Sequence, residues 1–537
     1  MAKKKNENTL QYLQMPLPEG RRFSKMTKVA FGGLNKRYTL DSGGLTMESN
    51  ISTSEYPYLV PSMARTEILS DYYRRSISSN IEYHSFPISM FAFDNFLIVV
   101  YATDTYFINE GYRSKAVFID YITSEGVVYN AECYETDDFS PRSIVQFNAF
   151  NEDKDGTIIN GTFLKRLLIF PDKKSMFFNI FDDEKTSETN KTFTLYDMDS
   201  EDGTIVTPPI KYATVHLSRV FGVSDNCVFA SGFNDYTNWA LDTPDDTYGE
   251  GYNESNAWMS QTQANTKADG NFTGIINYQG HIVCFKRDYM HEIYNTKNPF
   301  RLTDVYAEGT IDNRTIQDVD GKLIFVSEDD VKIYTGSNPR IIGYNLNMSQ
   351  YTYAVSGTDN RNYYLYCEDD KEKKYLYVYD TYTDLWSEQS IESQVLSFAH
   401  NKNGMYMLCA DGCVYKMDTD DYSHEWSFET DLITNKTVDI KHIKKLQMLV
   451  ELENKENTNI DVYILYDDEK FDVLTTEEKA KRLVYSNKTR KRYGKLPIRV
   501  KPRNTANYGF KLHIEGSGYV KLYELEIFVE AGGDLYV

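Results

Sequence analysis

The feature that most constrains the fold is a hairpin pattern that repeats between about residues 85 and 420. In each repeat, a short apolar, β-branched or aromatic run precedes a polar or Gly/Asp-containing turn and a second such run, which predicts two antiparallel strands. Neighbouring pairs lie roughly 40–60 residues apart, a spacing typical of propeller blades. The predicted strand pairs are Phe96–Tyr101 with Thr105–Ile108, Leu167–Phe170 with Met176–Ile180, Val220–Gly222 with Cys227–Ser231, Ile282–Phe285 with His291–Tyr294, Leu323–Val326 with Val331–Tyr334, Tyr363–Tyr366 with Tyr375–Tyr379, and Met405–Cys409 with Cys413–Lys416.

This spacing predicts an all-β chain whose main part is a β-propeller of about six to eight blades. The 44 tyrosines and 29 phenylalanines agree with a β-rich chain, because aromatic side chains fit the pleated, half-buried surface of a sheet. Helical periodicity is nearly absent. A β-sandwich over residues 85–420 remains an alternative interpretation, since sandwiches also contain evenly spaced short strands.

Two tryptophans are expected to pack between blades. The stretch Leu376–Trp386 resembles the kelch-type blade pattern, in which a strand leads into an Asp-centred turn and then to a Trp. The Asp side chain caps the backbone of the turn, and Trp386 fills the seam between neighbouring blades. Trp239, which follows another predicted strand pair, is assigned the same role.

The composition changes near residue 425, where longer apolar runs begin. Alternation within Ile460–Tyr466 and Lys511–Glu515 predicts antiparallel strands with one solvated face. We therefore expect three parts: a flexible or partner-bound arm over residues 1–25, the β-propeller over 26–425, and a C-terminal antiparallel β-sandwich over 426–537. The expected sandwich strands are His442–Glu453, Ile460–Tyr466, Leu496–Val500, Tyr508–Glu515 and Tyr519–Val529.

The sequence contains no recognisable catalytic motif: no phosphate-binding loop, no nucleophile elbow and no HExxH. The six cysteines are scattered without the paired spacing of a zinc site, so we expect reduced thiols. The metal candidate is the loop Asn151–Ile158, where Asn151, Asp153 and Asp155 would place oxygens as in a calcium loop. Its twelfth position is Thr162 instead of Glu, which favours a plain hairpin loop. We expect no enzyme activity and no cofactor.

The formal net charge of −21 disfavours general binding to nucleic acid or anionic membranes. Against this background, residues 479–503 contain eleven basic residues and no acid. The stretch is either a solvated face or a docking patch for an acidic surface, such as a neighbouring copy. The docking candidates within it are Arg490, Lys491, Arg492 and Lys495.

The N-terminal sequence Met-Ala-Lys-Lys-Lys is not followed by an apolar segment, so no secretory signal is expected. The longest strongly apolar run, Phe96–Val100, is too short to cross a bilayer, and no membrane insertion is expected.

Three groups of motifs follow one another along most of the chain. They are Phe31–Asn35 with Asn50-Ile51, Tyr56–Leu59 and Arg65; Arg219–Ser224 with Val228–Gly232 and Asn238-Trp239; and Phe510–Gly518 with Leu522-Tyr523 and Gly532–Asp534. In this order they resemble the motifs of phage and prophage propeller proteins. The resemblance is to tail hub or nozzle proteins of short-tailed phages, also called packaged-DNA stabilisation proteins.

The resemblance implies a structural virion protein that forms a homo-oligomeric ring, usually hexameric, around the DNA exit channel below the portal and its adaptors. Portal, adaptor and other tail proteins would be its partners, and genomic DNA would pass through without specific binding. Assembly would take place in the host cytoplasm and the protein would reside in the virion tail. An acidic channel wall agrees with this role because it repels DNA. A host-surface glycan-binding tail adhesin and a polysaccharide-degrading enzyme remain the alternative functions.

Overall fold

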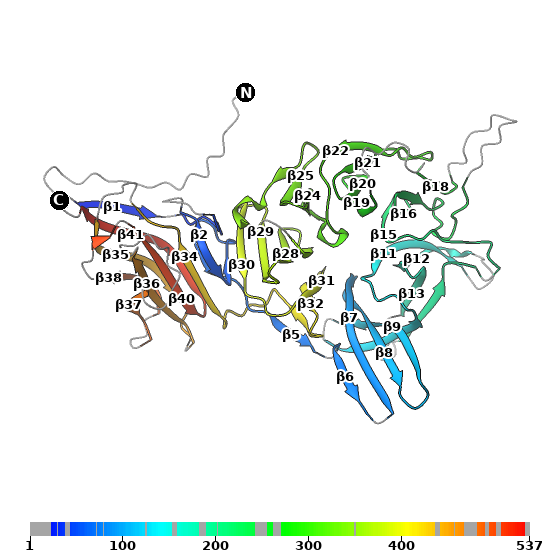
Figure 1. Cartoon of the computed structure of the whole chain (residues 1–537), viewed down its shortest axis with the longest axis horizontal. Helices are drawn as coiled ribbons and strands as arrows, with labels where there is room; N and C mark the ends of the chain where they lie inside the picture. Colours follow the sequence, from blue (N-terminus) through cyan, green and yellow to red (C-terminus); the bar gives the residue numbers. More distant parts are fainter. Residues whose placement is uncertain are drawn as a thin grey trace.

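The computed structural model consists almost entirely of β-strands (Figure 1). Among the described residues, the only other regular elements are two short 3-10 turns, η1 (Asn313–Thr315) and η2 (Gly343–Leu346). The predicted all-β class is therefore confirmed. The structure describes residues 23–28, 30–37, 43–70, 72–78, 80–123, 126–152, 158–181, 190–200, 202–241, 255–260, 270–347, 351–434, 441–455, 457–466, 481–488, 493–500, 506–507 and 509–531.

Seven antiparallel sheets of four or five strands lie radially around a common centre, and we number them 1 to 7 in chain order (Figure 1). Sheet 1 contains β6 (Arg74–Ile77), β7 (Ile81–Phe93), β8 (Phe96–Phe107), β9 (Tyr112–Ile122) and β10 (Val128–Glu135). Sheet 2 contains β11 (Ser143–Glu152), β12 (Ile158–Phe170), β13 (Lys174–Phe181) and β14 (Asn190–Asp197). Sheet 3 contains β15 (Tyr212–His216), β16 (Arg219–Ser224), β17 (Cys227–Ala230) and β18 (Trp258–Met259).

The next four sheets complete this arrangement, which we call the ring. Sheet 4 contains β19 (Phe272–Tyr278), β20 (His281–Lys286), β21 (Met290–Ile293) and β22 (Thr303–Tyr306). Sheet 5 contains β23 (Gln317–Val319), β24 (Lys322–Val326), β25 (Val331–Tyr334) and β26 (Arg340–Ile341). Sheet 6 contains β27 (Tyr353–Thr358), β28 (Asn362–Glu368), β29 (Lys374–Asp380) and β30 (Leu385–Gln389). Sheet 7 contains β31 (Val395–Asn401), β32 (Gly404–Cys409), β33 (Val414–Lys416) and, from far earlier in the chain, β5 (Thr66–Leu69).

A hydrophobic cluster fills the space between each pair of neighbouring sheets, from sheets 1 and 2 round to sheets 6 and 7. A further cluster joins sheet 7 back to sheet 1, where Leu408 of β32 and Val99 of β8 are both fully buried. The ring is therefore closed by the same kind of packing that joins every other pair of sheets, and the fold is β-propeller-like.

The second and third strands of each sheet carry the continuous apolar runs seen in the sequence. All six residues of β20, for example, are buried, because a neighbouring sheet covers each of its faces. Successive side chains point to opposite faces, so Ile282 packs toward sheet 3 while Val283 packs toward sheet 5. Six of the seven predicted hairpins are confirmed by this pairing. The seventh is wrong, since residues 96–107 form the single strand β8.

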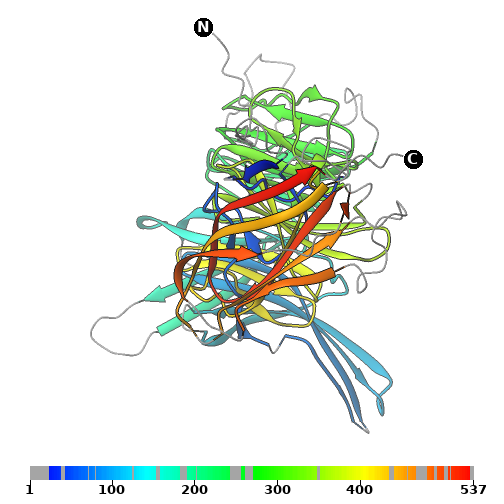
Figure 2. The ribbon, with the colours of Figure 1, turned by 90° about the vertical axis from the view of Figure 1, so that its left-hand side faces the viewer.

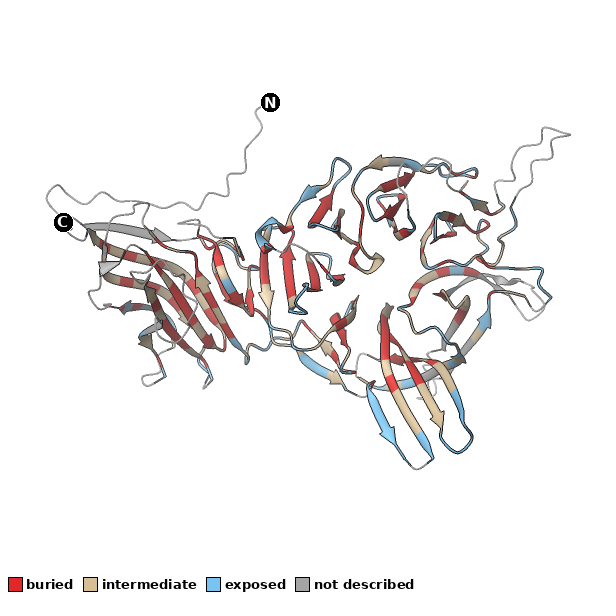
Figure 3. Ribbon diagram, in the orientation of Figure 1, coloured by how far each residue is buried: buried red, intermediate tan, exposed pale blue. Residues whose placement is uncertain are grey.

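Two further five-stranded sheets share one hydrophobic core, and we call them the two-sheet unit. The first contains β1 (Phe23–Lys28), β41 (Val520–Ala531), β35 (Lys441–Leu452), β38 (Gly494–Val500) and β39 (Ala506–Asn507). The second contains β2 (Leu45–Ser49), β34 (Glu425–Thr430), β40 (Phe510–Ser517), β36 (Asn459–Tyr466) and β37 (Lys481–Ser486). The two sheets lie beside the ring (Figure 1) and in front of it when the molecule is turned by 90° (Figure 2), and their strands are rich in buried residues (Figure 3). A small two-stranded sheet joins β3 (Ile51–Ser52) to β4 (Val60–Pro61).

The structure corrects the predicted boundaries. Strand β1 pairs with β41 and β2 pairs with β34, so the N-terminal strands belong to the two-sheet unit and not to the start of the ring. Residues 26–425 are therefore not one domain. The first strand begins at Phe23, inside the predicted arm over residues 1–25. The ring itself starts with β5, which pairs with β33 near its other end. The error has a physical cause, because pairing between strands hundreds of residues apart leaves no local pattern.

Candidate functional site

The ring and the two-sheet unit meet at a joint that combines apolar packing with hydrogen bonds. It begins with two side chains three positions apart. Phe31 is buried in the core of the two-sheet unit, and Leu34 is buried in the cluster between sheets 5 and 6. The backbone N–H of Leu34 donates to the carbonyl oxygen of Trp386 at 2.8 Å. One short segment thus anchors in both cores.

The outer edge of sheet 6, strand β30, is covered by this same N-terminal segment. The backbone N–H of Glu388 donates to Oε1 of Glu48 at 2.8 Å, and the N–H of Asn50 donates to the carbonyl of Glu388 at 2.9 Å. The side chain of Asn50 then accepts from the N–H of Ser390 at 2.9 Å and donates to the carbonyl of Glu425 at 2.8 Å. Because an uncovered strand edge invites pairing with other chains, this cover both links the two units and protects the sheet.

Charge adds to the joint. The Lys36 ammonium lies 2.7 Å from the Glu388 carboxylate and donates to the Tyr377 hydroxyl at 2.8 Å. The ammonium also lies 4.4 Å from the ring centroid of Tyr375. The side chains of Lys36 and Glu388 are each about one-fifth exposed, and the two tyrosines are buried or half-buried. Solvent therefore screens this ion pair less than a pair at the surface.

Glycine is required at position 33. A Cβ there would lie 2.3 Å from the Trp386 carbonyl oxygen and 3.0 Å from the Leu385 Cβ. We expect Gly33→Ala to lower the free energy of unfolding by about 1–3 kcal/mol, as overpacking does. The neighbouring Gly32→Ala is the control, because its Cβ would lie 3.3 Å from the Gly43 carbonyl oxygen, a much milder contact than the one at Gly33. Thermal unfolding of both variants checks this, and equal melting temperatures would contradict it.

Glu48 is 3% exposed, and burial raises the pKa of its carboxyl well above the ordinary value of 4.5. The unfolded chain therefore ionises this group more readily than the folded one as the pH rises above 4.5, and the protein loses stability over that range. We expect Glu48→Gln, which keeps the acceptor for Glu388 N–H, to become more stable than the wild type as the pH rises. At pH 4 and below the two should be alike. Urea midpoints measured from pH 4 to 8 test this, and a constant difference would contradict it.

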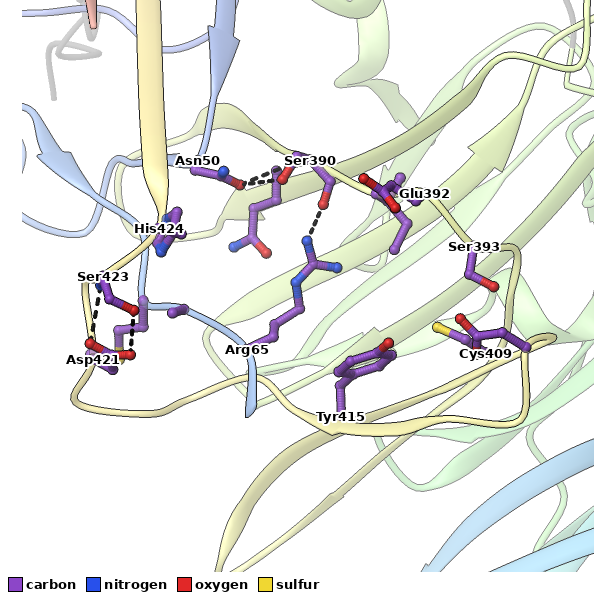
Figure 4. A pocket seen from close by; sticks show the side chains of 15 residues that line it. Asn50, Arg65, Ser390, Glu392, Ser393, Cys409, Tyr415, Asp421, Ser423 and His424 are labelled. Atoms are coloured by element: carbon purple, nitrogen blue, oxygen red, sulfur yellow. Dashed lines mark hydrogen bonds between the residues drawn. The ribbon is translucent and has the colours of Figure 1, made fainter. Parts of the chain in front are cut away.

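A pocket of about 420 Å³ opens at the joint, between the end of β30, sheet 7 and residues 421–424 (Figure 4). The Arg65 side chain crosses it and donates to the Ser390 carbonyl. Burial lowers the pKa of Arg65, and burial followed by the nearby Arg65 charge lowers the pKa of His424. The cation is thus committed to a backbone carbonyl within the joint.

Two other groups of this pocket are Cys409 and Asp421. Burial raises the pKa of the Cys409 thiol to about 12, so it is not a thiolate at neutral pH. Asp421 accepts from the N–H and the hydroxyl of Ser423 at 3.0 and 2.7 Å, and these bonds lower its pKa. The arrangement can fix the chain where the two units meet.

The predicted blade-packing tryptophans both lie between sheets. Trp386, on β30, is 2% exposed, belongs to the cluster between sheets 5 and 6, and donates through Nε1 to the Ile342 carbonyl at 2.7 Å. Trp239 lies between β17 and β18 and packs, partly buried, against the cluster between sheets 2 and 3.

The other predicted site residues are only partly described. Asn151 lies on β11, while Asp153 and Asp155 fall outside the described residues. Where the structure describes the chain, no group of three His, Cys, Asp or Glu is arranged to hold a metal ion. Among the same residues, no helix is both long and apolar enough for a membrane span.

The basic stretch is described in part, and Arg490, Lys491 and Arg492 lie outside that part. Lys495 is exposed on β38, and its ammonium lies 3.9 Å from the ring centroid of Tyr523. The nearby Lys488 pairs with Asp461 at 2.7 Å. Some of the basic charge is thus engaged within the two-sheet unit.

Sequence reasoning missed a buried ion pair between sheets 1 and 2. The Arg142 side chain is 0% exposed and pairs with Asp172, which is 6% exposed and also accepts from the Tyr134 hydroxyl. The guanidinium further donates to the Asp138 carbonyl at 2.6 Å. No spacing signal marks this pair, because its two members lie in separate loops. For the joint a signal did exist: Gly32-Gly33 between two apolar residues, which predicts close backbone approach.

No protein-family model and no curated protein sequence matches the chain. Solved structures with some likeness include the acylaminoacyl peptidase of Pyrococcus horikoshii, at 11% identity and a TM-score of 0.30, covering 64% of this chain and 57% of the peptidase. The β-propeller domain of the trilobed protease from Pyrococcus furiosus gives 11% identity and a TM-score of 0.29, with 64% and 95% covered. BamB from Moraxella catarrhalis gives 9% and 0.28, with 68% and 99% covered. The chain thus spans little more than half of the peptidase, and likenesses at these TM-scores carry no argument about function.

Proposed function

We propose that the ring is a seven-bladed β-propeller, that the two-sheet unit is a β-sandwich, and that the chain is a structural subunit of a phage tail. In this proposal, copies of the protein form a tail hub or nozzle ring below the portal and connector, around the channel through which genomic DNA leaves. The protein resides in the virion and has no catalytic role.

The observation that carries the proposal is the joint. The residues that gave the resemblance to tail hub proteins at the N-terminus are the same residues that hold the two units together: Phe31, Gly33, Leu34, Asn50 and Arg65. They bind backbone groups and fill cores. A motif that serves to lock two β-units together suits a scaffold better than an enzyme.

Charge also supports a conduit. The net charge of −21 makes the chain repel the phosphate backbone, so DNA would slide past a wall of such subunits without binding. The test is electron microscopy of the purified protein, alone and with a connector ring. We expect closed rings with an open central channel and no shift of linear DNA in a gel at 0.15 M salt.

A glycan-binding tail adhesin is the second candidate, and one observation favours it. A hollow of about 420 Å³ lies beside Trp239, Asp235 and Asn238, and the buried indole N–H of Trp239 has no hydrogen-bond partner among the described residues. An indole next to amide and carboxylate groups is a combination that suits a sugar ring. A monomeric protein that binds or cleaves host surface glycan would overturn the structural proposal.

A further inference from the structure

The pocket at the joint contains a positive charge that has no counter-charge of its own. The Arg65 guanidinium donates to the Ser390 carbonyl, and among the described residues it forms no ion pair with a carboxylate. Other buried or half-buried arginines have more partners: Arg314 pairs with Asp312 at 2.8 Å, and Arg219 donates to two backbone carbonyls. Since a guanidinium carries several N–H donors, Arg65 has donors left for a further acceptor.

The surroundings of Arg65 favour binding of a counter-ion. Burial lowers the pKa of Arg65, which means that the pocket disfavours the isolated cation. Charges withdrawn from water are normally paired, so an unpaired one gains when an anion joins it. The planar guanidinium presents pairs of N–H groups that match the two oxygens of a carboxylate or phosphate. An oxyanion is therefore the partner that suits Arg65.

The space beside the guanidinium admits more than a simple ion. The pocket encloses about 420 Å³, within the range of small-molecule sites, and it lies where two units meet, which is a common place for such sites. Glu392, Ser393 and Tyr415 lie on one side of Arg65 (Figure 4). They supply a carboxylate, a hydroxyl and a phenol ring, so a ligand held by Arg65 meets further polar partners and one aromatic face.

The other charges of the pocket decide which oxyanion fits. Its three acids, Glu392, Asp411 and Asp421, are all exposed, whereas Arg65 is half-buried. The Glu392 carboxylate is near enough to favour the Arg65 charge, yet it forms no ion pair with it. A doubly charged phosphate would be repelled by these acids. A single carboxylate meets less repulsion, and N–H or O–H groups on the same ligand would find acceptors in the acids.

We propose that this pocket binds a small molecule that combines one carboxylate with hydrogen-bond donors, as a sugar acid or an amino acid does. The ligand carboxylate pairs with the Arg65 guanidinium, and its hydroxyl or ammonium groups donate to Glu392. The site is separate from the hollow beside Trp239. It does not depend on the proposed ring of copies, because all of its residues come from one chain.

Two matched pairs of probes test the ligand class: glucuronate against glucose, and glycine against glycinamide. The carboxylate is the main difference within each pair. We expect at least one carboxylate probe to raise the melting temperature and to bind in calorimetry, because a ligand of the folded state stabilises it. Its matched partner should do neither. The pair that responds tells whether the ligand is a sugar acid or an amino acid.

The matched variants are Arg65→Lys and Arg287→Lys. Both keep a positive charge, but the Arg287 side chain is 60% exposed and lies outside the pocket. We expect Arg65→Lys to weaken binding of the carboxylate probe by at least about tenfold, since an ammonium lacks the paired donors of a guanidinium. Arg287→Lys should bind like the wild type. Melting temperatures without probe show whether each variant is folded.

Phenylglyoxal, a reagent that modifies arginine, gives a second readout in the unchanged chain, in case Arg65→Lys folds poorly. We expect the bound carboxylate to slow modification of Arg65 and not of Arg287, as measured by mass spectrometry of peptides. The inference is overturned if neither carboxylate binds, if glucose or glycinamide binds equally well, or if inorganic phosphate binds more tightly. Unchanged affinity of a folded Arg65→Lys variant, or no protection of Arg65, would overturn it as well.

Discussion

Replacing Trp386 by alanine should lower the free energy of unfolding by about 3–5 kcal/mol, the range for removing a large aromatic side chain from a core. The indole is 2% exposed and lies 4.9 Å, centroid to centroid, from the ring of Tyr379. Its Nε1 donates to the Ile342 carbonyl across the gap between sheets 5 and 6. Leu34 is buried in the same hydrophobic cluster as the indole, so the loss of the indole would also loosen the joint.

The measurement is the urea midpoint together with proteolysis of the joint near residue 36. Trp386→Phe serves as the control, because it keeps an aromatic ring and removes the Nε1 hydrogen bond, and its loss should be clearly smaller. If alanine cost less than about 1 kcal/mol, the side chain would not be part of a well-packed core between the sheets.

The second large effect is expected at the ion pair between sheets 1 and 2. Arg142→Met should lower the free energy of unfolding by about 3–5 kcal/mol, because it leaves the Asp172 carboxylate buried without its cation. The variant also loses the bond from the guanidinium to the Asp138 carbonyl.

The matched control removes both charges. Arg142→Met combined with Asp172→Leu should recover most of the loss, since replacing a whole buried pair by apolar groups costs far less than breaking it. Denaturant curves of the wild type, both single variants and the double variant give the coupling energy. If the double variant were no more stable than Arg142→Met, the unpaired Asp172 charge would not be the cause of the lost stability.

Much of the ring could be predicted from the sequence because its middle strands are covered on both faces. Such strands read as short continuous apolar runs, and β20, β24 and β28 were all found in this way. The outer strands could not be predicted in this way because some are very short. Strand β26, for example, consists of two exposed residues, which form no sequence pattern. The prediction divides β8 in two between Tyr101 and Thr105, where the strand contains the polar residues Thr103 and Asp104.

The joint could be predicted less well. Its residues were singled out by resemblance, but their role depends on which backbone passes over Gly33 and which strand edge Asn50 covers. Those partners lie hundreds of residues away in the chain. The basic stretch shows the limit in another way: net charge along the sequence did not indicate that Lys488 already has a partner in Asp461.

The pairing of β1 and β2 with strands at the far end of the chain, and of β5 with β33, has a consequence for synthesis. The ribosome makes the closing strands first and their partners last. Until β41 emerges, β1 has no partner in its sheet, and until β33 emerges, β5 has no strand to pair with. Contacts of such long sequence separation form slowly, and unpaired strands are prone to associate with other chains meanwhile. The nascent protein therefore cannot complete the ring before β33 has been made, or the two-sheet unit before β41 has been made.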